Sequence, residues 1–107
     1  MRNEAEILRS FSRLHRETLL MWIERGWLAP QKDREGYQFQ EVDVARIRLI
    51  HEFRFELDID DDALDVILPL LDQVHGLRHE LRRLGNAINA QPEDVRKRIA
   101  AVLSTSG

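Results

Sequence analysis

Residues 67–88 read ILPLLDQVHGLRHELRRLGNAI, and this stretch decides the architecture of the 107-residue chain. Aliphatic side chains recur in it at alternating spacings of three and four residues: Ile67, Leu70, Val74, Leu77, Leu81, Leu84 and Ile88. On an α-helix this spacing gives one narrow apolar row, which we call the aliphatic seam. Charged residues occupy the other faces, so we expect the helix to pair along the seam with a second copy of the chain. The alternative is packing of the seam within one chain.

A helix-turn-helix and a hairpin are expected before the seam. Apolar residues three and four apart predict short helices over residues 4–11 and 16–25, with a break at residues 12–15. Gly26 follows the second helix and suits the left-handed conformation that often ends a helix. Two short helices with a tight turn form a helix-turn-helix, and the pattern of residues 28–39 predicts a small hairpin, or wing, beside it.

A third and a fourth helix complete the expected fold. Residues 40–56 supply the third helix, and a turn at residues 57–59 leads to the fourth helix, which starts near Asp60. The expected fold class is therefore all-α, with a winged helix-turn-helix head followed by a long C-terminal helix that carries the seam.

Local signals set the expected boundaries along the chain. The expected parts are a head, a long dimerisation helix and a short C-terminal helix with a tail, at residues 1–59, 60–90 and 91–107. Pro69 lies inside the pattern of the fourth helix and removes one backbone hydrogen bond, so we expect a kink or a restart there. Pro92 and the two acids after it predict the start of the last helix, and residues 104–107 are expected to be disordered.

The composition excludes several classes of protein and site. The chain has no cysteine, which excludes disulfides, thiolate metal sites and cysteine nucleophiles. It has no run of about 18 consecutive apolar residues, so we expect no transmembrane span. The N-terminal MRNEAEILRSF is too charged for a signal peptide, and the expected compartment is therefore the cytoplasm.

The distribution of charge argues against nucleic-acid binding. The net charge is −3, and residues 1–57 hold ten basic and ten acidic side chains. Residues 58–72 hold six aspartates and no basic side chain. Proteins that bind nucleic acids usually carry a net positive face, because binding depends on neutralising phosphates. The chain is therefore a poor candidate for a DNA-binding protein on charge alone, and a local basic face stays open as the alternative.

Two runs of the head, TLLMWIERGWLAP at residues 18–30 and GYQFQEVDVARIRLI at residues 36–50, resemble patterns of the MerR family of transcription regulators. The matching positions are Thr18, Leu19, Gly26, Leu28, Pro30, Gly36, Tyr37, Asp43, Arg46, Arg48 and Ile50. The resemblance extends over residues 5–88 and implies a winged helix-turn-helix head carried by a long dimerisation helix.

Three positions depart from the family pattern where the family grips DNA. Leu20 and Met21 stand in place of an arginine and a tyrosine, and Gln38 stands in place of an arginine in the wing. Each lost phosphate contact lowers the affinity for DNA, so these departures favour a head that has lost its grip on DNA. Leu20 and Met21 also form a small apolar patch, open either to a protein contact or to partial burial under the wing.

Three further runs are similar to the CbpM family of MerR-like chaperone modulators: WIERGWL at residues 22–28, the stretch at residues 39–50, and LLDQVHGLR at residues 70–78. Members of that family bind the J-domain of the co-chaperone CbpA and inhibit its activity. The resemblance implies that this chain binds such a J-domain and occludes the surface that engages Hsp70. A DNA-binding transcription regulator is the alternative, and a purely structural dimerisation module is a third possibility.

Acidic residues are the candidate partner-binding residues, because J-domains present a basic helix to Hsp70. The candidates are the acids of one cluster together with the apolar pair: Asp58, Asp60, Asp61, Asp62, Asp65, Leu20 and Met21. Acids on the head are the other candidates: Glu4, Glu6, Glu17 and Glu24. The cluster also has a structural interpretation, since aspartates at the start of a helix stabilise it through capping and the helix dipole.

The remaining polar and aromatic residues favour structural roles. Trp22 and Trp27 flank Gly26 and are expected in the core of the head. His75 and His79 are four residues apart, but no third ligand lies near them, so we expect solvated side chains and no metal site. No phosphate-binding loop and no pair of nucleophile and base occurs, so we expect no enzyme activity and no cofactor.

Overall fold

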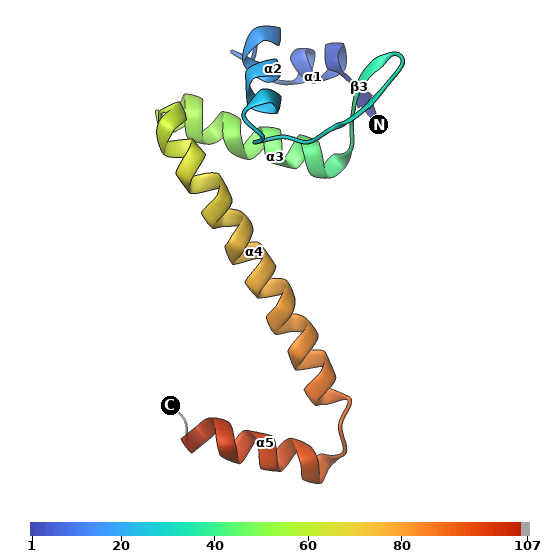
Figure 1. Ribbon diagram of the computed structural model, residues 1–107, viewed down its shortest axis with the longest axis vertical. Coiled ribbons are helices and arrows are strands. Elements are labelled where there is room, and N and C mark those ends of the chain that lie inside the picture. Colours follow the sequence, from blue (N-terminus) through green and yellow to red (C-terminus); the bar gives the residue numbers. More distant parts are fainter. Residues whose placement is uncertain (106–107) are drawn as a thin grey trace. The chain divides into compact units, whose positions relative to one another are not determined.

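The computed structural model describes residues 1–105 and is mostly helical with one small sheet (Figure 1). In chain order the elements are β1 (Arg2–Asn3), α1 (Glu4–Ser10), α2 (Arg16–Glu24), β2 (Gln31–Asp33), β3 (Gly36–Phe39), α3 (Glu41–His51), the π-helix η1 (Glu52–Glu56), α4 (Asp61–Asn89) and α5 (Glu93–Thr105). The expected fold class, a winged helix-turn-helix head followed by a long C-terminal helix, is confirmed. The chain divides into two compact units, Met1–Leu68 and the residues from Pro69 onward.

The helix-turn-helix forms where local signals start and stop each helix. The Asn3 carboxamide accepts a hydrogen bond from the Glu6 N–H at 2.9 Å, and the Glu6 carboxylate accepts one from the Asn3 N–H at 3.4 Å. This capping box satisfies two backbone donors at the start of α1. Helix α2 ends before Gly26, whose φ of +80° confirms the expected left-handed residue.

The wing is the hairpin β2–β3, and β3 is the central strand of a three-stranded antiparallel sheet. Gln31 pairs with Gln38 on one side of β3, and Arg2 pairs with Phe39 on the other. The hairpin is the expected one. The sequence did not predict β1, because a strand of two residues is too short to show an alternating pattern.

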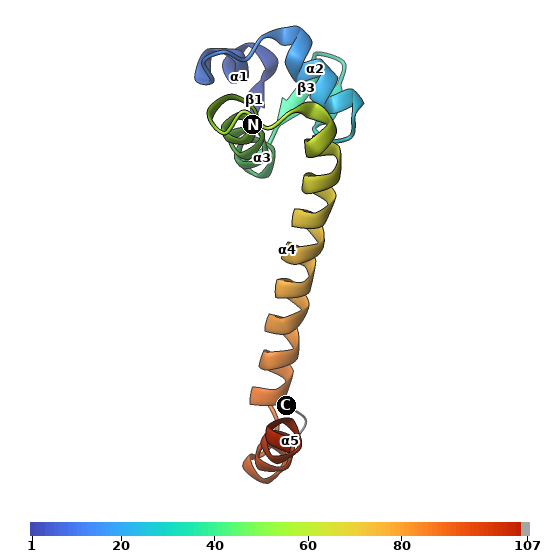
Figure 2. The ribbon, with the colours of Figure 1, turned by 90° about the vertical axis from the view of Figure 1, so that its left-hand side faces the viewer.

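The head has one apolar core to which helices α1 to α4 and the wing contribute, and Figure 2 shows α1, α2 and α3 gathered around the strands. Its buried hydrophobic side chains are Ile7, Leu14, Leu19, Trp22, Trp27, Leu28, Phe39, Val44, Ile47, Ile50, Leu64 and Leu68. The expected burial of both tryptophans is confirmed. Leu64 and Leu68 belong to α4, so the first two turns of that helix are part of the head.

The junction between α3 and α4 is less regular than expected. Helix α3 ends at His51 and continues as the π-helix η1, whereas one helix was expected to residue 56. Asp58 then adopts a left-handed φ of +57°, and the Asp60 carboxylate accepts a hydrogen bond from the Ala63 N–H at 2.8 Å. The expected capping role of Asp60 is therefore confirmed.

Helix α4 runs without a break from Asp61 to Asn89, with Pro69 inside it. A restart of the helix at Pro69 is therefore excluded, and a kink there stays a prediction. Helix α5 extends to Thr105, so the expected disorder is wrong for Ser104 and Thr105, whose hydroxyls donate to the Ala101 carbonyl at 2.9 and 3.3 Å. The last two positions of that expectation, 106 and 107, lie outside the described residues. Among the helices of residues 1–105, none combines the length and apolar content that a membrane span requires.

Candidate protein-interaction surfaces

The outer side of α2 carries two acids around two apolar residues. Glu17, Leu20, Met21 and Glu24 follow the spacing that places side chains on one side of a helix, and we call them the α2 face. The two glutamates are exposed, and Leu20 and Met21 are half-buried. Within residues 1–105, no hydrogen bond or ion pair engages the side chain of either glutamate. The face therefore offers two free carboxylates beside a partly open apolar patch.

The position of Glu24 is unfavourable for α2 itself. Glu24 is the last residue of the helix, and no basic residue lies in the last turn. A carboxylate at a helix C-terminus is repelled by the partial negative charge of the unpaired carbonyls. Glu17, in the first turn, has the opposite relation to the dipole and would stabilise the helix there. Helix stability therefore accounts for Glu17 but not for Glu24.

The arginines close to α2 are exposed and pair with other groups of the head. Arg16 forms an ion pair with Glu4, and the Arg13 guanidinium donates to the Phe55 carbonyl at 3.1 Å. The Arg25 guanidinium donates to the Asp65 carboxylate at 3.0 Å and lies over the Trp27 ring, 5.4 Å from its centroid. Because these cations already have partners, each would have to share or give up a contact within the head in order to bind a phosphate.

The acidic cluster divides between structural and exposed residues. Asp61 accepts a hydrogen bond from Arg54 at 3.0 Å, and Asp60 caps α4. Asp65 accepts hydrogen bonds from Trp27 Nε1 at 2.7 Å and from Arg25. The side chain of Asp58 is 98% exposed, with Arg54 4.0 Å away, and Asp62 is exposed without a partner within residues 1–105. Asp58 and Asp62 are therefore the acids of the cluster that are most open to a partner.

Asp65 fastens the first turns of α4 to the rest of the head. We expect Asp65→Ala to lower the free energy of unfolding by about 1–3 kcal/mol, because the buried Trp27 indole N–H loses its acceptor. Asp62→Ala removes an exposed acid three residues earlier and should change that free energy by less than about 0.5 kcal/mol. Urea unfolding followed by tryptophan fluorescence at one protein concentration measures both. Equal losses in the two variants would contradict this role.

Sequence reasoning missed the Asp65 contact because its partners are distant in the chain. Trp27 and Asp65 are 38 residues apart, and only the packing of α4 on the head brings them together. Several aspartates closely precede Asp65 in the sequence, so they predict that its side chain belongs to a charged surface. A lone tryptophan beside a helix end carries no signal for the acceptor that its indole needs.

The aliphatic seam lies open along α4. Relative exposures are 54% for Leu70, 66% for Leu77 and Leu81, and 57% for Leu84, and Val74 is exposed as well. Ile67 and Ile88, at the two ends of the seam, are half-buried. A contiguous row of exposed aliphatic side chains is unusual on a protein surface and is typical of an interaction site.

Metal-ligating residues are scattered rather than clustered. No group of three or more His, Asp or Glu side chains within residues 1–105 is arranged to hold a metal ion. His75 and His79 are exposed on α4.

Comparison with protein families gives one match, to a model described as MerR HTH family regulatory protein, over residues 5–86. The matched stretch covers well over half of the chain and includes most of the head and most of α4. Neither the curated proteins nor the solved structures gave a match.

Proposed function

The chain belongs to the MerR HTH regulatory protein family. Within this family, we propose that it modulates a CbpA-type J-domain co-chaperone by binding the J-domain. In this proposal the protein occludes the J-domain surface that engages Hsp70. It acts by binding alone, without a catalytic residue, a cofactor or a metal. The predicted cytoplasmic location is part of the proposal.

The single observation that carries the proposal is the α2 face. In a DNA-binding member of the family, this helix would approach phosphates, and carboxylates there would repel them. Glu17 and Glu24 are free carboxylates at that place, and Leu20 and Met21 between them are apolar. Such a surface complements a basic amphipathic helix, whose cations meet the glutamates while its apolar side covers the patch.

The exposed acids Asp58 and Asp62 offer a second place for the same partner chemistry. They lie at the start of α4, away in sequence from the α2 face. We favour the α2 face, because it combines acids with apolar area, and apolar anchors supply most of the binding energy at protein interfaces.

We propose that the protein forms a homodimer in which the aliphatic seams of two chains pair. Five exposed aliphatic side chains in heptad spacing support this, since pairing with a second copy would remove them from water. The charged positions beside the seam, including the ion pair between Arg83 and Glu80 at 3.1 Å, suit the solvated flanks of a coiled coil.

Calorimetric titration with the isolated J-domain of a CbpA-type co-chaperone tests the proposal, with a random DNA duplex as the control. Saturable binding of the J-domain at micromolar concentration or below, and none of the duplex, is the expected result. Binding of DNA with a steep salt dependence and no heat from the J-domain would restore the transcription regulator as the better hypothesis. No binding of either would leave a dimerisation module.

A further inference from the structure

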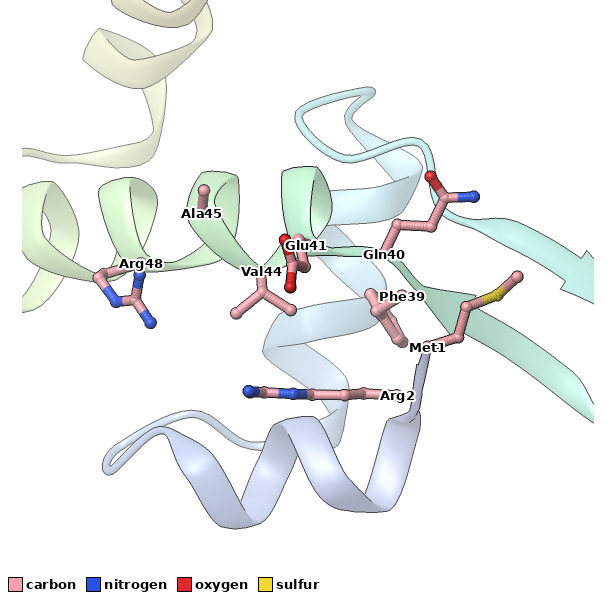
Figure 3. A pocket seen from close by; sticks show the side chains of 8 residues that line it. All are labelled: Met1, Arg2, Phe39, Gln40, Glu41, Val44, Ala45 and Arg48. Carbon is pink, nitrogen blue, oxygen red and sulfur yellow. The ribbon is translucent and has the colours of Figure 1, made fainter.

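A pocket of about 420 Å³ opens on the head between β1 and α3 (Figure 3). Its volume lies within the range of about 300–1,000 Å³ that is usual for small-molecule sites. None of the residues that line it belongs to the surfaces described above. The proposed function therefore gives this pocket no role.

Two arginines enter the pocket from different elements. Arg2 comes from β1 and Arg48 from α3, and their side chains extend along the same side of α3 in Figure 3. Within the described residues 1–105, no hydrogen bond or ion pair engages either guanidinium group. Two unpaired guanidinium groups in one concave site attract an anion, and their planar donors suit a carboxylate.

The base of the pocket is apolar. Phe39 and Val44 line it and are 1% and 7% exposed, so their side chains belong to the core and hold a fixed surface. Because Phe39 and Val44 leave almost no area open, the apolar side chains that stay accessible in the pocket are Met1 and Ala45, which also line it and are exposed. An apolar group of a ligand that covers Met1 and Ala45 would leave water without disturbing the fold. Cations around an apolar base match a ligand that has an anionic end and an apolar body.

The charges around the pocket favour a single negative charge on the ligand. Glu41, in the first turn of α3, also lines the pocket, and its negative charge offsets part of the positive charge of the two arginines. Its carboxylate repels a second negative charge on the ligand. We propose that the pocket binds a small organic monocarboxylate, with the carboxylate between Arg2 and Arg48 and the apolar body against Met1 and Ala45.

Titration of the full chain with hexanoate, followed by two-dimensional NMR, tests this proposal. We expect saturable binding with a Kd on the order of 1 mM, as befits so small a ligand, with shifted amide signals at residues of the pocket. Hexanol, which lacks the carboxylate, and inorganic phosphate, which lacks the apolar body, should each bind at least about tenfold more weakly.

Variants identify the site. The double variant Arg2→Gln, Arg48→Gln should weaken hexanoate binding by at least about tenfold, because it removes both cationic donors. Arg34→Gln, an exposed arginine at the hairpin tip, is the matched control and should leave binding unchanged. Equal affinity for hexanol, equal affinity for phosphate, an unaffected double variant, or no saturation at millimolar concentrations would each overturn the proposal.

Discussion

Replacement of both Leu77 and Leu81 by aspartate should convert the proposed dimer to a monomer. Both side chains are 66% exposed in a single chain and lie in the middle of the aliphatic seam. Burial of one leucine is worth about 1.5–3 kcal/mol, and the double variant removes four leucines from a symmetric interface. It also places four carboxylates where they would lose water without a partner. Sedimentation equilibrium at several protein concentrations measures the molar mass and therefore the expected loss of the dimer.

The matched control for this variant keeps the number of substitutions and moves them off the seam. Val42 and Leu57 are 70% and 58% exposed and lie outside the seam, so replacing both by aspartate should leave the dimer intact. Near-ultraviolet circular dichroism of the buried Trp22 and Trp27 reports whether the head stays folded in both variants. A seam variant that remains dimeric, or an unaltered chain that is already monomeric, would contradict the proposed interface.

The fold was predictable wherever a periodic pattern runs over several turns. The seam alone predicted the long helix, and the spacing of apolar residues predicted α1, α2 and the helix after Pro92. Gly26 ended α2 as expected, because a positive φ is a demand that glycine meets more easily than other residues. These signals are local, so they survive without knowledge of the tertiary structure.

Features that depend on tertiary contacts could not be predicted. The π-helix at residues 52–56 has a sequence that suits an ordinary α-helix equally well. The left-handed Asp58 and the strand β1 likewise form only where the rest of the head holds them. A residue other than glycine can adopt a positive φ when packing compensates the strain, and no sequence pattern announces this.

The candidate surfaces were predictable in part for the same reason. Helical spacing identified the seam and placed Leu20 and Met21 together on α2. The contribution of each acid depended on partners that sequence spacing does not reveal, such as Arg54 for Asp61 and Arg25 for Asp65. The arginine pocket stayed hidden, because Arg2 and Arg48 are brought together only when β1 pairs with β3 beside α3.

Charge reversal of the α2 face should strongly weaken the proposed binding of the J-domain. Close charge pairs across an interface are coupled by about 1.5–7 kcal/mol, so Glu17→Lys with Glu24→Lys should weaken binding at least about hundredfold. Both side chains are exposed and have no partner within the described residues 1–105, so the substitutions should leave the head folded. Calorimetric titration with the J-domain at low ionic strength measures the loss.

The acidic cluster supplies the control, because Asp58→Lys with Asp62→Lys changes the net charge by the same amount. If only the overall charge attracts the J-domain, both double variants should lose the same affinity. In both, this loss should become smaller as the salt concentration is raised, because salt screens the charges. If the partner docks on the α2 face, the cluster variant should change binding only slightly. Loss of binding in the cluster variant alone would transfer the docking surface to the start of α4.

The apolar part of the α2 face separates docking from attraction over a distance. Leu20→Ala with Met21→Ala keeps every charge and removes the side chains that would be buried under a bound helix. The affinity should fall while its dependence on salt stays the same, because charge pairs set the salt slope and apolar burial does not. A variant with unchanged affinity would mean that the partner contacts the glutamates without covering the helix between them, and the α2 face would then not be the docking surface.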